Sequence, residues 1–126
     1  MRKDLVISVY EIVGSPLCVA SNDGQKIYDR LSAALKEDRD VSLSFRNIKM
    51  LTSAFLNAAI GQLYGTFTEE KIRSLLQVQD MESDDLALLK RVVDTAKQYF
   101  KDPNKFNQAV RDALEGENDD TQSRKC

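Results

Sequence analysis

Residues 41–65, VSLSFRNIKMLTSAFLNAAIGQLYG, decide the fold because the spacing of their apolar residues changes partway along the stretch. Val41, Leu43 and Phe45 alternate with polar residues, and this period of two predicts a strand with one buried face. After a short basic loop, the apolar residues recur at helical spacing. They are Phe55, Leu56, Ala59, Ile60 and Leu63. The stretch therefore predicts a strand, a loop and a helix that packs against the strand.

The helix is predicted to begin at Thr52 and Ser53. Hydroxyl side chains are favoured there because they accept hydrogen bonds from the free N–H groups of the first turn. The same N–H groups and the helix dipole also favour an anion. Ser53 can therefore be a plain helix cap or a regulated hydroxyl, and the residues leave both open. Arg46 and Lys49, on the preceding loop, are placed to meet a phosphate or an acidic partner.

These residues resemble the signature of the STAS domain, the fold of bacterial anti-sigma factor antagonists. More closely, they resemble the related STAS-like domain of unknown function. In the STAS signature a strand ends in Asp-Leu or Asp-Phe, a loop with an aliphatic residue follows, and Asp-Ser-Ser-Gly opens a helix. The matching residues here are Ser44-Phe45, then Ile48 and Leu51, then Thr52-Ser53-Ala54-Phe55. The resemblance extends over roughly residues 4–101.

The resemblance implies both a fold and a function. The fold is α/β, a STAS-like mixed sheet of four or five strands with helices packed mainly on one face and the strand 41–45 in the centre. Ser53 falls on the serine that a histidine-kinase-like ATPase phosphorylates in the antagonists. The implied function is a small regulatory protein-interaction domain that acts by partner switching and catalyses nothing itself. Thr52, Phe55 and Ser44 depart from the signature, where it has aspartate, glycine and an acidic residue.

Two other classes of function remain as alternatives. The first is a ligand-sensing module that binds a nucleotide or other anion at the N-terminus of the helix starting near Ser53. It ranks second because the sequence has no glycine-rich phosphate loop. The second is an enzyme, which would need the hydroxyl of Thr52 or Ser53 to be activated by Lys49. The complete absence of histidine removes the commonest general base and the usual zinc ligand.

Composition indicates a single small domain in the cytoplasm. The chain has 126 residues, of which 42% are hydrophobic and 30% charged, and its net charge is −2. Such a balance favours neither nucleic acid nor membrane as a partner. We expect no metal and no cofactor, and the sequence leaves the oligomeric state open. Cys18 lies in an apolar run and is predicted to be a buried free thiol.

The remaining elements follow from apolar spacing and from helix caps. We expect strands at residues 5–13, 17–20 and 72–78 and a helix that is capped by Ser21 or Asn22. A second long helix is predicted over residues 83–100, and a third from Asp102 to about Leu114. Residues 1–115 then form one domain, and residues 116–126 are predicted to be a disordered tail.

The predicted core combines the apolar residues of the strands with those of the helix stripes. Its members are Ile7, Val9, Leu31, Leu35, Leu43, Phe45, Phe55, Ala59, Leu63, Leu89, Val93 and Phe100.

Overall fold

The computed structural model describes residues 4–101. The elements in chain order are β1 (Asp4–Ser8), α1 (Val9–Val13), β2 (Leu17–Cys18), α2 (Ser21–Lys36), β3 (Asp40–Ser44), β4 (Met50–Leu51), α3 (Ser53–Ala59), the 3₁₀ helix η1 (Gly61–Gly65), α4 (Glu69–Leu75), β5 (Leu76–Gln79) and α5 (Ser83–Lys101). Contacts group the chain into two compact units, Met1–Ala96 and Lys97–Cys126. The predicted helix from Asp102 and the boundary at residue 115 lie outside the described residues.

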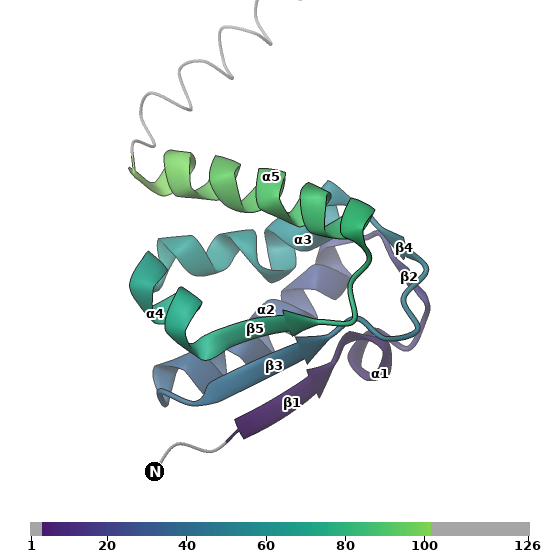
Figure 1. Ribbon diagram of the computed structural model, residues 1–126, viewed down its shortest axis with the longest axis horizontal. Helices are drawn as coiled ribbons and strands as arrows, with labels where there is room; N and C mark the ends of the chain where they lie inside the picture. The colour runs from purple at the N-terminus through teal and green to yellow at the C-terminus, as the bar shows by residue number, and fades with distance from the viewer. Residues whose placement is uncertain (1–3, 102–126) are drawn as a thin grey trace, which may run out of the picture. The chain divides into compact units, whose positions relative to one another are not determined.

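The α/β class is confirmed, and β3 is the central strand as predicted. Three strands form a parallel sheet in the order β1-β3-β5, and β2 pairs with β4 in a separate two-stranded parallel sheet (Figure 1). Among the described residues the five strands are thus divided between two parallel sheets, where one mixed sheet was expected. Parallel neighbours require crossover connections, which the intervening helices supply.

Helices cover one face of the three-stranded sheet, also as predicted. On that face Ile7, Val41 and Leu43 are buried, and α2 and α4 contact β3. On the opposite face, Val6 is exposed and lies in register with Ser42 of β3. The strand order explains this arrangement. Both crossovers advance in the same direction across the sheet, so two right-handed connections place their helices on the same side.

The first predicted strand, residues 5–13, is wrong beyond Ser8. The Ser8 hydroxyl accepts a hydrogen bond from the Glu11 N–H at 3.2 Å and caps α1. Gly14 ends this helix in the left-handed conformation, with φ of 78°, and its N–H donates to the Tyr10 carbonyl. A serine followed three residues later by glutamate is a helix-start signal, and it outweighs the apolar run around it.

The predicted strand 72–78 is wrong in its first half. Thr68 accepts from the Lys71 N–H at 3.1 Å and caps α4, and two glutamates lie in the first turn. Ile72 and Leu75 are both buried, three residues apart, which is the spacing of one helix face. The strand is confined to β5, where Leu76 and Val78 lie on the helix-covered side.

Nine of the predicted core residues are buried. They are Ile7, Val9, Leu31, Leu35, Leu43, Phe45, Phe55, Ala59 and Leu63. Leu89 and Val93 are partly buried, because α5 buries Val92 and Ala96 instead. The prediction of Phe100 as a core residue is wrong, since its side chain is 41% exposed. Phe100 lies beyond Ala96, where the first unit ends, and its ring contacts Tyr99 edge to face at 4.8 Å between centroids.

Helices α2 and α3 pack closely against each other at Gly24, which is buried. A Cβ atom at this position would lie 2.5 Å from the carbonyl oxygen of Phe55 and 2.8 Å from the Cβ of Ala58. Only glycine lets the two backbones approach so closely. Gly24 thereby sets the position of α3, the helix whose N-terminus carries Ser53. None of the helices within residues 4–101 combines the length and apolar character that crossing a membrane requires.

Candidate functional site

The predicted site residues lie on the chain that leaves β3 and enters α3. Phe45 is buried at the end of β3, and Arg46 begins an exposed loop. Asn47 has a φ of 70°, the left-handed conformation that turns the loop. Lys49 is exposed next to β4. In the described residues no hydrogen bond or ion pair joins the side chains of Arg46 or Lys49 to other residues, so both cations face solvent.

The segment that enters α3 is fastened to β2 by backbone hydrogen bonds. The N–H groups of Lys49 and Met50 both donate to the Pro16 carbonyl, at 2.8 and 3.3 Å. The Thr52 N–H donates to the Cys18 carbonyl at 3.2 Å. These bonds form the β2–β4 pair. The predicted strand 17–20 is confirmed at Leu17–Cys18, whereas β4 was not predicted, because a two-residue strand is too short to show a period. The backbone bonds hold the start of α3 in a defined position.

The two neighbouring hydroxyls at the start of α3 have different surroundings. Thr52 donates from its hydroxyl to the Val19 carbonyl at 2.7 Å and accepts from the Phe55 N–H at 3.2 Å. Thr52 is therefore the helix cap and also a tie to the chain after β2. Ser53 is the first residue of α3 and is exposed, and its side chain has no hydrogen bond to another described residue.

Thr52→Val is expected to lower the free energy of unfolding by about 1–2 kcal/mol, because valine has the shape of threonine but makes neither hydrogen bond. Thr52→Ser, which keeps the hydroxyl, serves as the matched control and is expected to stay within about 0.5 kcal/mol of the wild type. Urea unfolding followed by circular dichroism measures both variants. Equal stability of the valine and serine variants would show that the hydroxyl contributes nothing.

Ser44 stands where the STAS signature has an acidic residue, and it is hydrogen-bonded to a carboxylate that follows another strand. Its hydroxyl donates to Asp80 Oδ2 at 2.8 Å and accepts from the Arg46 N–H at 3.3 Å. Asp80 follows β5 directly and has a φ of 61°. The carboxyl ends of parallel strands meet at one edge of a sheet, which brings these residues together across 36 positions of sequence. Sequence analysis missed Asp80; its place directly after an alternating strand was the available signal.

Beside the start of α3 lies an exposed apolar surface that was also not predicted. Leu17 and Met50 stand opposite each other in the β2–β4 pairing, and each is 51% exposed. Val19, two residues after Leu17, is 44% exposed. We call these three residues the β2–β4 patch. Single exposed apolar residues are ordinary, but a group of them on adjacent strands is typical of an interaction surface.

Cys18, between the outward residues of β2, points into the core and is a free thiol as predicted. Burial raises the pKa of this thiol to about 11, and the negative charge of Asp23 adds to the effect. The thiolate is the nucleophilic and metal-binding form, so Cys18 is chemically inert at neutral pH. Among residues 4–101, no three side chains of the metal-binding types come together as a cluster.

A comparison with known protein families identifies the family of this chain. The family model described as a STAS-like domain of unknown function matches residues 23–86. This range runs from the first turn of α2 into α5 and includes β3, the β2-bound loop before α3, Ser53 and Asp80. Neither the curated proteins nor the solved structures contain a match to the chain.

Proposed function

The chain belongs to the family of STAS-like domains of unknown function, and from that membership we propose that it is a small regulatory domain that acts by binding another protein. The observation that carries the proposal is the β2–β4 patch. It is an exposed apolar surface beside the exposed hydroxyl of Ser53 and the two solvent-facing cations of Arg46 and Lys49. Apolar anchors framed by charge are typical of protein interfaces.

The partner surface is expected to complement these features. We expect Leu17 and Met50 to contact apolar side chains of the partner. We expect Arg46 and Lys49 to pair with acidic side chains of the partner around that contact. The backbone bonds to Pro16 and Cys18 hold this surface in place before binding. A preformed surface loses less conformational entropy when a partner docks, which favours a specific interaction.

We propose further that phosphorylation of Ser53 controls this binding. An ATPase-fold kinase transfers the γ-phosphoryl group of ATP to Ser53 Oγ, and ADP and the hydroxyl proton are released. The phosphate adds a charge of roughly −1.5 to −2. That charge neutralises the attraction of Arg46 and Lys49 for an acidic partner and repels the partner directly. The kinase carries out the reaction, so we propose no catalytic activity for this chain.

The surroundings of the two hydroxyls favour Ser53 over Thr52 as the phosphate acceptor. Modification of Thr52 would replace the bonds to Val19 and Phe55, which anchor the helix start. Ser53 is exposed and can be modified without loss of those bonds. The alternative of an anion held at the α3 N-terminus has less support, because Thr52 already occupies the Phe55 N–H and α3 has only seven residues.

Ser53→Asp is expected to weaken binding to a protein partner by at least about tenfold, which corresponds to about 1.4 kcal/mol. The carboxylate places negative charge where the phosphate would be. Ser53→Ala is expected to bind like the wild type and to resist phosphorylation. The partner assay uses a histidine-kinase-like ATPase from the same genome, with ATP, mass spectrometry for modification and calorimetry for affinity.

Ser83→Asp is the matched control for this experiment, because Ser83 is the exposed first residue of α5 and the substitution changes charge equally. It is expected to leave affinity unchanged, and Met50→Ser is expected to weaken binding. The switch fails if the ATPase modifies neither Ser53 nor Thr52 and Ser53→Asp binds as tightly as the wild type. The docking surface fails separately if Met50→Ser binds normally.

A further inference from the structure

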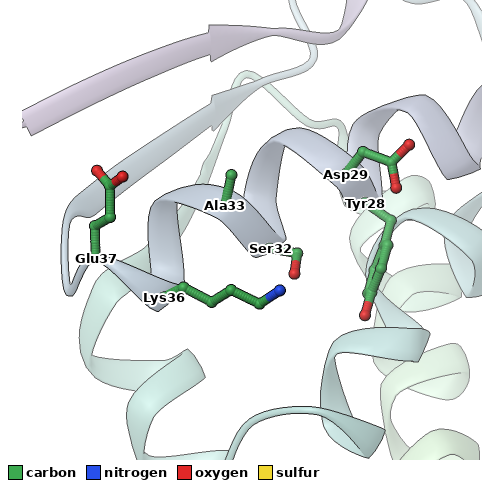
Figure 2. A pocket seen from close by; sticks show the side chains of 6 residues that line it. All are labelled: Tyr28, Asp29, Ser32, Ala33, Lys36 and Glu37. Carbon is green, nitrogen blue, oxygen red and sulfur yellow. The ribbon is translucent and has the colours of Figure 1, made fainter.

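A groove of about 440 Å³ runs along α2, and none of its lining residues belongs to the surface described above. Its lining residues are Tyr28, Asp29, Ser32, Ala33, Lys36 and Glu37 (Figure 2). Tyr28, Ser32 and Lys36 follow one another at intervals of four, so they lie in one row on the helix. A volume of this order is sufficient for a small metabolite.

The hydrogen-bond donors and the carboxylates of this groove point in different directions. Lys36 extends along the groove toward Ser32, and the hydroxyls of Ser32 and Tyr28 point to the same side (Figure 2). The carboxylates of Asp29 and Glu37 point away from that side, and Asp29 accepts a hydrogen bond from Gln25 Nε2 at 3.1 Å. The interior of the groove therefore presents donors and positive charge.

Ser32 is the most informative of these residues. The residue is 7% exposed, and within the described chain its hydroxyl has no hydrogen-bond partner. Among the described residues, Arg39 Nε is the fully buried side-chain atom that lacks a partner, so the Ser32 hydroxyl keeps an opening to the groove and can donate to a ligand there. Lys36 likewise forms no ion pair with another described residue. An acceptor group placed between them would satisfy both.

Tyr28 adds a third donor. Its hydroxyl oxygen lies 2.8 Å from the Thr66 hydroxyl oxygen. When the Thr66 hydroxyl donates in this bond, the Tyr28 proton remains available to a ligand. Tyr28 also contributes an aromatic face beside the groove, which suits the organic part of a metabolite.

We infer that this groove binds the oxyanion of a small metabolite, a carboxylate or a phosphate monoester. Lys36 Nζ supplies the positive charge, and the hydroxyls of Ser32 and Tyr28 donate hydrogen bonds to the anion oxygens. The outward carboxylates of Asp29 and Glu37 disfavour ligands with further anionic groups, so the ligand carries a single carboxylate or phosphate. The inference does not depend on the proposed partner switching, because none of these residues belongs to that surface.

The test is a titration of the full chain, labelled with nitrogen-15, with inorganic phosphate and separately with acetate, at constant ionic strength set by sodium chloride. We expect saturable changes in the amide resonances of residues 28–37 and Thr66. Lys36→Gln and Ser32→Ala are expected to weaken the apparent affinity at least about tenfold. Lys26→Gln is the matched control, because Lys26 lies on the same helix and pairs with Asp23 at 3.3 Å. Circular dichroism confirms that each variant is folded.

Saturation by phosphate alone or by acetate alone supports the inference and identifies the anionic group. Three results would overturn it: no saturable change with either anion, unchanged affinity in Lys36→Gln, or changes confined to residues 46–53. The last of these would place the anion at the start of α3 instead. An equal loss in Lys26→Gln would also overturn it, because the effect would then be general charge screening.

Discussion

Phe55→Ala is expected to remove about 3–5 kcal/mol from the free energy of unfolding. The ring is fully buried in the first turn of α3, and the carbonyl of the same residue contacts α2 at Gly24. Truncation to alanine leaves a cavity between α2 and α3. Neither helix can move to fill this cavity without losing its other packing contacts. For a domain of this size such a loss is comparable with the whole stability.

Guanidinium unfolding at low temperature measures this effect, with Phe100→Ala as the matched control. Phe100 is 41% exposed, so the same chemical change is expected to cost less than about 1 kcal/mol there. If Phe55→Ala does not fold, Phe55→Leu keeps the prediction testable, because the smaller cavity leaves part of the stability. A loss below about 1 kcal/mol in Phe55→Ala would mean that the ring lies outside the core.

Gly24→Ala is expected to lower the free energy of unfolding by about 2–3 kcal/mol, toward the upper end of the usual cost of overpacking. The new Cβ would lie 2.5 Å from a backbone carbonyl, and a carbonyl can move only if the whole of α3 moves. This cost exceeds the gain of about 1 kcal/mol that alanine has over glycine within a helix. Displacement of α3 would also shift Ser53, so partner binding should weaken along with stability.

Gly61→Ala is the matched control for this prediction. A Cβ at Gly61 would meet the Asn57 side-chain oxygen at 2.6 Å, and the other near atoms lie at 3.4 and 3.6 Å. The end of a side chain can rotate away, so this substitution is expected to change stability by less than about 1 kcal/mol. Thermal unfolding of the two variants, measured side by side, tests whether Gly24→Ala lowers stability more than Gly61→Ala. Equal melting temperatures would show that the α2–α3 contact tolerates a methyl group.

Elements whose apolar residues keep one clear period were predictable from the sequence, and elements without such a period were not. The alternation in residues 41–45 and the helical stripes of α2 and of residues 55–63 identified the central strand and seven of the nine buried core residues. Helices α1 and α4 have five and seven residues, and over so few positions a helix stripe and a strand alternation look alike. Their caps, Ser8 and Thr68, were the local signals that distinguish the two.

The candidate site was predictable only in its local part. A helix cap at Thr52 and an exposed neighbour at Ser53 follow from the immediate sequence. The tie from Thr52 to Val19 and the bond from Ser44 to Asp80 join residues 33 and 36 positions apart. Such pairs depend on how strands are ordered in the sheet, and that order is a property of the whole fold rather than of any short segment.

The buried thiol in β2 also makes local opening of the interaction surface measurable. Cys18 is inaccessible and its pKa is about 11, so an alkylating reagent reaches it only when the β2–β4 pair opens. When reclosing is faster than alkylation, the labelling rate is the opening equilibrium constant multiplied by the rate for a free thiol. In a Cys126→Ser background, the labelling rate of the Cys18 sulfur therefore measures the opening of the β2–β4 pair. A protein docked on Leu17 and Met50 would slow that labelling in proportion to its occupancy, with no fluorophore added to either molecule.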